Sequence, residues 1–146
     1  MTTHSHTLLL ITADPSHPLA HIALRYARTY LQTLSTTADR NNTTFTNDHQ
    51  APLNIFFYAD AANTANRLRW QSADQINITE EWQNLAKQYQ LTLPVCVSTA
   101  LSRGITDSEN SARHQLDSEN LASGFTLVGL SELAMMMQEN CRLIQF

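Results

Sequence analysis

Glycine is scarce in this sequence, with only three among 146 residues. The chain lacks both the G-x-x-x-x-G-K-[ST] and the G-x-G-x-x-G pattern, which excludes a glycine-rich loop that cradles phosphates. Cysteine is scarcer still, because only Cys96 and Cys141 occur. Without a C-x-x-C pair, these two support neither a disulfide framework nor a thioredoxin-like dithiol, and they fit a reducing cytoplasm. We expect no cofactor.

Strong charge and long apolar runs are absent as well. The net charge is only -4, so no general attraction to nucleic acid is expected. No apolar run approaches the ~18 residues of a membrane span. The first six residues lack a basic region followed by an apolar one, so no signal peptide is expected. These absences predict a cytoplasmic protein without direct contacts to membrane or nucleic acid.

Short apolar runs alternate with helical patterns along the chain. The runs are short enough for strands that are buried on both faces. We expect strands at 7–11, 53–58, 91–97, 125–128 and 142–146, and helices at 20–34, 78–89 and 130–139. This alternation predicts a three-layer α/β/α fold with a mostly parallel sheet of about five strands. The length suits one domain, so residues 1–146 are expected to form a single unit.

One segment, residues 35–52, breaks this alternation. It is dominated by Thr, Asn, Asp, Ser and Gln, and Phe45 is its only large apolar residue. Such a composition cannot bury enough surface to offset the entropy of ordering the chain. We expect a flexible insertion between the first helix and the second strand, tolerated on the surface.

The stretch from Leu93 to Gly104 carries the clearest chemical signal. Ser98 is a good N-cap, and residues 99–103 suit a short helix that Gly104 would end. Cys96 is therefore expected where a strand passes into a helix N-terminus, whose N–H groups favour a thiolate. A thiolate is nucleophilic, so Cys96 is a candidate for attacking or carrying sulfur. On these residues alone, a buried structural cysteine remains the alternative.

Other polar residues are candidates for contacts to a substrate or partner. Asn66 follows the second expected strand, at the face where α/β sheets bind ligands, although Asn66 also suits a turn. Arg103 and Arg113 follow Cys96 and are candidates for holding an anionic sulfur, unless they are ordinary surface cations. Residues 108–116 are expected to form a loose helix over the cysteine.

No metal site is expected from the histidines. His17 and His21 are four residues apart, but Pro18 disfavours helical geometry at His17, and no further ligand stands at zinc spacing. Cys141 lies far from Cys96 in the sequence and is expected to be structural.

Residues 96–105, Cys-Val-Ser-Thr-Ala-Leu-Ser-Arg-Gly-Ile, resemble the cysteine segment of the TusD/DsrE family of sulfurtransferases. Further matching segments occur in family order at 55–58, 65–68, 120–130 and 144–146. Together they span about 7–146 apart from one insertion, and they are most similar to the TusD type. The first loop, residues 13–18, departs from that type because it lacks glycines, so no site residue is carried over from it.

The resemblance implies a DsrE-like fold in which Cys96 carries a persulfide. It implies that an upstream persulfide donor protein loads Cys96, and that the sulfur then passes to a partner cysteine on the route to 2-thiouridine at the tRNA wobble position. It also implies a hetero-oligomer with TusB- and TusC-like subunits and a TusE-like acceptor. Tyr58 and Asn66 match the family pattern. The alternatives are a DsrE-type subunit of a sulfur-oxidation complex, and a non-catalytic scaffold or small-ligand binding subunit.

Overall fold

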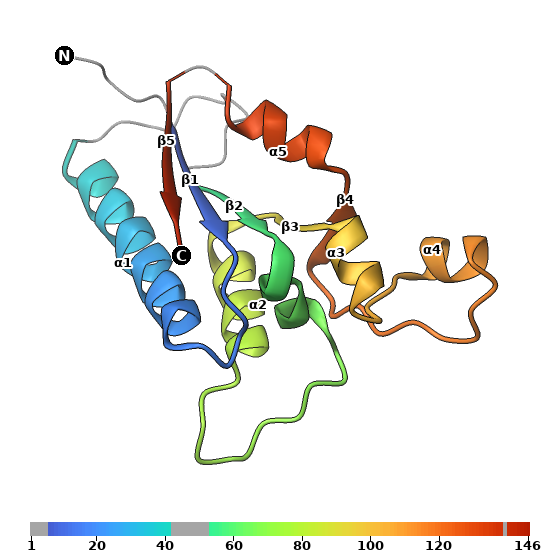
Figure 1. Ribbon diagram of the computed structural model, residues 1–146. Helices are drawn as coiled ribbons and strands as arrows, with labels where there is room; N and C mark the ends of the chain where they lie inside the picture. Colours follow the sequence, from blue (N-terminus) through green and yellow to red (C-terminus); the bar gives the residue numbers. More distant parts are fainter. Residues whose placement is uncertain (1–5, 42–52, 139) are drawn as a thin grey trace.

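A parallel five-stranded sheet forms the centre of the protein (Figure 1). The computed structural model describes residues 6–41, 53–138 and 140–146. The strands are β1 (His6–Ile11), β2 (Asn54–Phe57), β3 (Leu93–Cys96), β4 (Phe125–Val128) and β5 (Cys141–Gln145). Their order across the sheet is β4-β3-β2-β1-β5, and every neighbouring pair runs parallel. The predicted α/β class and strand number are confirmed.

The central strands are buried on both faces, as their continuous apolar runs require. Leu8 and Leu9 are adjacent in β1, so their side chains point to opposite faces, and both are fully buried. Leu9 belongs to the larger core, which also contains Trp82, whereas Leu8 packs with Phe56 and Cys96 in a second, smaller cluster. The protein therefore has one hydrophobic layer on each side of the sheet.

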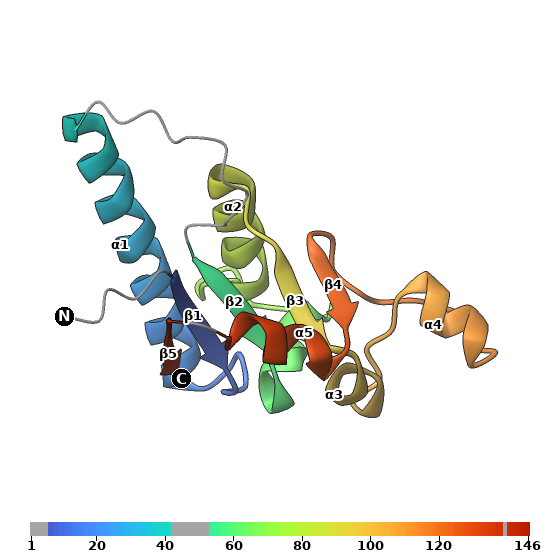
Figure 2. The same ribbon diagram turned by 90° about the horizontal axis from the view of Figure 1, so that it is seen from above.

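Helices cover the two faces unequally (Figure 2). The larger core contains apolar residues of α1 (Pro18–Asn41), of the 3₁₀ helix η1 (Ala59–Ala65) and of α2 (Ile78–Tyr89). The opposite face carries α5 (Leu130–Met136), which connects β4 at one edge of the sheet to β5 at the other. This short helix therefore crosses the sheet face above the strands that lie between those edges. The three-layer prediction is confirmed.

The long helix α1 corrects the start of the predicted insertion. It continues to Asn41, so residues 35–41 are helical rather than part of a loop. The polar composition was misleading because the hydroxyls hydrogen-bond within the helix, each donating to the carbonyl four residues earlier. These donors are Thr33, Ser35, Thr36 and Thr37. The rest of the predicted insertion, 42–52, lies outside the described residues.

The start of α2 also differs from the expectation. The sequence favours Thr79 as the N-cap, ahead of Glu80 and Glu81, but the N-cap is Asn77, whose side chain accepts a hydrogen bond from the Glu80 N–H at 3.3 Å. The Thr79 hydroxyl instead donates to the backbone oxygen of Thr64 at 2.7 Å. This bond ties α2 to η1. No helix in the described part of the chain is long and apolar enough to cross a membrane.

Candidate functional site

Cys96 lies at the junction of a strand and a helix. It is the last residue of β3 and the N-cap residue of α3 (Val97–Ser102). The expected junction is confirmed, but α3 begins earlier than the sequence suggested, so Ser98 lies inside the helix and does not cap it. The Thr99 hydroxyl donates to the Cys96 backbone oxygen at 3.2 Å, which fixes the first turn. The chain thus holds Cys96 at the carboxyl end of a central strand.

The Cys96 side chain is buried, with only 1% of its surface exposed. It shares the smaller hydrophobic cluster with Leu8 of β1 and Phe56 of β2, and we call this group the Cys96 cluster. Partly buried residues that pack against it are Leu10, Tyr58, Val128, Leu133, Met136 and Cys141. Tyr58 and Cys96 each come directly after the paired residues Phe57 and Val95, so Tyr58, the first residue beyond β2, is level with Cys96 at the end of β3. The structure therefore brings Tyr58 to the site.

The cover above the Cys96 cluster comes from α5, which corrects the expectation that residues 108–116 would provide it. Leu133 and Met136 of α5 pack against the cluster. The expected helix exists as α4 (Ser108–Arg113), but it stands away from the sheet in both views (Figures 1 and 2). The physical reason is that this segment offers only one large apolar side chain, Leu116, which is itself 52% exposed.

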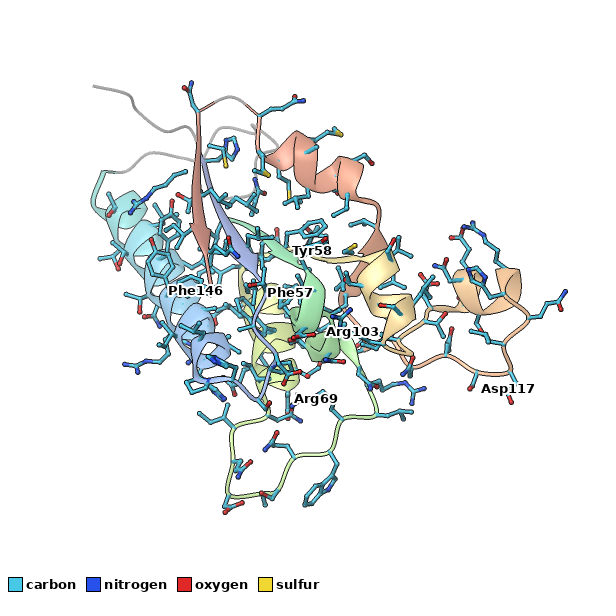
Figure 3. All side chains as sticks on the ribbon, in the orientation of Figure 1. Phe57, Tyr58, Arg69, Arg103, Asp117 and Phe146 are labelled. Atoms are coloured by element: carbon cyan, nitrogen blue, oxygen red, sulfur yellow. The ribbon has the colours of Figure 1, made fainter. Side chains whose placement is uncertain are left out.

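Arg103 is the C-cap residue of α3 and connects that helix to η1. Its Nη2 and Nε lie 2.8 and 3.2 Å from Asp60 Oδ1, and its Nη1 donates to the Thr99 backbone oxygen at 3.1 Å. Figure 3 labels both Arg103 and Tyr58. Asp60 was not identified from the sequence. Its position just beyond the carboxyl end of β2 is the signal that would have indicated it.

The backbone between Tyr58 and Asp60 takes an unusual turn. Ala59 has a φ of 54°, in the left-handed region that residues with a Cβ adopt only when the surrounding structure enforces it. This turn lets Tyr58 pack against the Cys96 cluster while Asp60 meets Arg103. The two contacts on either side of Ala59 therefore hold the end of β2 next to α3.

Asn66 and Arg113 lie outside the Cys96 cluster. The Asn66 side chain accepts hydrogen bonds from the Leu68 N–H at 3.0 Å and from Asn120 Nδ2 at 3.2 Å, which is the role expected of an asparagine in a turn. It also lines a polar cavity of about 550 Å³ beside α2. Arg113 pairs with Glu109 of α4 at 2.9 Å on the exposed surface. Neither residue belongs to the Cys96 cluster.

The first loop after β1 contains a carboxylate that the sequence did not single out. Asp14 accepts hydrogen bonds from the Ser16 hydroxyl and N–H at 2.6 and 2.9 Å, and from Asn63 Nδ2 at 3.0 Å. Burial raises the pKa of Asp14, but these hydrogen bonds and the positive charge of Arg69 together lower the pKa below its ordinary value. A hydrogen-bonded aspartate thus shapes the loop that lacks glycine.

Cys141 cannot reach Cys96 in this fold. It begins β5 and pairs with His6, whereas Cys96 ends β3, with β2 and β1 between the two strands. Three strand spacings alone amount to about 14 Å, beyond the ~7 Å between Cα atoms that a disulfide allows. Burial raises the pKa of the Cys141 thiol, although a hydrogen bond with the Leu8 backbone partly lowers it. Both observations fit a structural cysteine.

The histidine pair offers no metal centre in the residues that the structure describes. No group of three or more His, Cys, Asp or Glu side chains is arranged there to hold an ion. His17 Nδ1 instead accepts a hydrogen bond from the Leu19 N–H at 3.1 Å, at the start of α1. The His17 imidazole therefore stabilises the turn at the start of α1.

Comparison with known protein families identifies this arrangement. The model of the DsrE/DsrF-like family matches residues 6–146, which include the whole described sheet and Cys96. The chain belongs to the DsrE/DsrF-like family. The resemblance that the sequence indicated is therefore confirmed.

Individual proteins that are similar to this chain give more detail. The chain is 37% identical over 94 residues to a protein named sulfurtransferase TusD homolog from Vibrio parahaemolyticus, a match that covers 64% of this chain and 72% of the relative. It is 39% identical over 92 residues to sulfurtransferase TusD from Serratia proteamaculans, covering 63% and 71%. The crystal structure of the YchN protein from E. coli superimposes with a TM-score of 0.63 over 97% of this chain and 98% of that one. At 15% identity, that last likeness shows the fold alone.

Proposed function

We propose that this DsrE/DsrF-like protein is a sulfurtransferase that carries sulfane sulfur as a persulfide on Cys96. The observation that carries the proposal is the position of Cys96 at the junction of β3 and α3. The first N–H groups of a helix have no partners within the helix, so they are available as donors to an anionic sulfur. The names of the TusD relatives support the same chemistry.

The proposed reaction has two steps, and neither requires an external oxidant or reductant. In the first, the Cys96 thiolate attacks the terminal sulfur of a donor persulfide, R–S–SH. The donor S–S bond breaks and Cys96–S–SH forms, with the proton of the terminal sulfur retained. The leaving group R–S⁻ takes up the proton that the Cys96 thiol lost when it became a thiolate. In the second, a thiolate of the acceptor attacks the terminal sulfur of Cys96–S–SH. Cys96 then leaves as a thiolate, and the acceptor holds the persulfide.

Four polar residues receive proposed roles around this chemistry. Tyr58 packs against the Cys96 cluster, so it is placed to contact a bound donor or acceptor. Arg103 stands at the far end of α3, where its charge is shared with Asp60. Arg113 is exposed on α4 and suits a contact to a partner protein better than a contact to sulfur. Asn66 lines the polar cavity beside α2 and would act there, away from Cys96.

The proposed route is a relay between proteins. The sulfur comes from an upstream persulfide donor protein and passes to a TusE-like acceptor, while TusB- and TusC-like subunits complete a hetero-oligomer. The route ends at 2-thiouridine in tRNA. Because each transfer is between proteins, this chain needs no contact with tRNA, which its net charge of -4 does not favour.

One observation favours a second candidate, a non-catalytic scaffold subunit. Cys96 is only 1% exposed, and a buried structural thiol has the same appearance. A scaffold would form no persulfide on this cysteine.

The test is to expose the purified full chain to a small-molecule persulfide donor and then to analyse its cysteine peptides by mass spectrometry. We expect one added sulfur on the Cys96 peptide, and its removal when an acceptor with a free cysteine is added. Cys141→Ser is the matched control, because it removes the other cysteine and should still be loaded. An unmodified Cys96 peptide after full exposure supports the scaffold instead.

A further inference from the structure

A sulfur carrier must admit both a donor and an acceptor, yet the Cys96 thiol is almost entirely buried. Attack on a disulfide or persulfide sulfur needs direct access of one sulfur to another. Some part of the structure must therefore move before Cys96 reacts. The parts that surround the thiol differ greatly in how firmly they are held.

The strands around Cys96 are firmly held. β3 pairs with β2 on one side and with β4 on the other, and Cys96 itself is level with Val128 in the β3–β4 pairing. Moving either neighbour would break hydrogen bonds of the sheet. α3 is fixed by the bonds from Arg103 to Asp60 and from Thr99 to the Cys96 backbone.

α5 makes far fewer buried contacts with the rest of the protein than the strands and α3 do. None of its residues is buried, and Gly129 at its N-cap position has no side chain to bond to the first turn. Two of its side chains, Leu133 and Met136, pack against the Cys96 cluster. The Met136 backbone oxygen also lies 3.0 Å from His6 Nε2. Segments with few buried apolar contacts are the ones that open locally at low free energy.

We propose that α5 is the cover of Cys96, and that Leu133 and Met136 determine which reactants reach its sulfur. The inference rests on the proposed persulfide chemistry. While α5 is closed, small thiols in solution are excluded from the persulfide; the reaction with an acceptor protein requires α5 to open. These two side chains thereby set the preference for a protein acceptor over small thiols.

The first test uses the unmodified full chain. Cys96 is alkylated with iodoacetamide under native conditions, and its rate is followed by mass spectrometry of its peptide, which separates it from Cys141. We expect a rate at least about a hundredfold below that of the unfolded chain, because reaction waits for local opening. We also expect this rate to rise only weakly with low concentrations of urea, since opening one short helix exposes much less surface than global unfolding.

The second test uses two matched pairs of substitutions within the same helix. Met136→Ala and Leu133→Ala remove inward-facing contacts, whereas Met135→Ala and Leu130→Ala remove side chains that are 71% and 47% exposed. We expect the inward changes to speed alkylation of Cys96 about tenfold, and the outward changes to alter it by less than about twofold. The urea midpoint of each variant, followed by far-UV circular dichroism, separates local opening from a loss of global stability.

Three results would contradict the proposal that α5 covers Cys96. They are native alkylation as fast as in the unfolded chain, a urea dependence as steep as that of global unfolding, and equal effects of inward and outward substitutions. Should an inward variant fail to fold, the urea dependence of the unmodified chain decides the matter alone. Alkylation involves no sulfur transfer, so the two proposals can fail separately. A Cys96 that is slow to alkylate but never forms a persulfide would contradict the proposed function and still support α5 as its cover.

Discussion

Arg103 and Asp60 join the helix that follows Cys96 to the turn that follows β2. The Arg103 Nη2 atom lies 2.8 Å from Asp60 Oδ1. The side chains are 29% and 64% exposed, so the pair is partly open to water, and its contribution to stability is limited. Its effect is instead on position, because it sets where α3 lies next to Tyr58.

Breaking this pair should have a small effect on stability that salt reduces. We expect Asp60→Ala to lower the free energy of unfolding by no more than about 1 kcal/mol at low ionic strength, and by less at 1 M salt. Glu109→Ala is the matched control, because it breaks the more exposed pair with Arg113 on α4. Urea unfolding at two salt concentrations measures the free energy of unfolding of both variants. Equal losses of free energy would show that the Asp60–Arg103 pair stabilises the protein no more than the exposed pair on α4.

Charge reversal should separate loading from delivery. We expect Arg103→Glu and Arg113→Glu to slow transfer to an acceptor protein about three- to tenfold, with a smaller effect on loading from a small persulfide donor, because charges at an interface rim govern encounter. Single-turnover transfer with each partner measures the two rates. Equal slowing of both steps would indicate that the arginine stabilises the Cys96 thiolate. No slowing of either step would show that it is an ordinary surface cation.

Removing the Cys96 sulfur should abolish transfer without unfolding the protein. Cys96→Ser keeps the size of the side chain close to that of cysteine, so we expect a well-folded variant with a melting temperature lowered by only a few degrees. Loading and delivery should fall to the background rate. Cys141→Ser should retain transfer, and full activity of the Cys96→Ser variant would contradict the mechanism.

Several features of this site could be predicted from the sequence, because they depend on local signals. The apolar run into Cys96 and the helix after it are local, and so are the strand spacings that define a parallel sheet. Asp60 was missed because its partner, Arg103, is 43 residues away and only the pairing of β2 with β3 brings the two together. The cover was assigned to residues 108–116 for a related reason. Nothing local shows that β5 lies at the far edge of the sheet, which is what draws α5 across Cys96.

The segment 42–52 should be dispensable, given its polar sequence. The helical residues 35–41 belong to α1 and should be kept, so we would replace only 42–52 with a short Gly/Asn turn. We expect the melting temperature to change by less than about 5 °C, which is on the order of 1 kcal/mol for a domain of this size. A larger fall would show that the segment packs on the body, and the sulfur-transfer rate of the same variant would show whether it serves the site.

Asp14 should make stability depend on pH in the acid range. Its pKa is lowered in the folded protein, so its contribution is fully present above the unfolded value of about 3.8 and is lost as the pH falls through the lower folded value. We therefore expect Asp14→Asn to be less stable than the unmodified chain at pH 7, with the difference shrinking below about pH 4. Asp117→Asn, at an exposed position on the surface (Figure 3), is the matched control for the removal of one carboxylate. Urea unfolding across this range provides the measurement.

The crossover from β4 to β5 has a kinetic consequence. Because both ends of the connection are strands of the same sheet, a melted α5 stays tethered at two points. The twelve residues between Val128 and Cys141 reach at most about 45 Å when extended, and the straight path between those strand ends takes up well over half of that. The tethers keep the melted segment near the sheet, so re-closure is a short-range search within one molecule and should be complete within microseconds. A partner that arrives at Cys96 must therefore react during a brief opening or hold α5 aside, so delivery should be fastest for a partner that binds next to the open site.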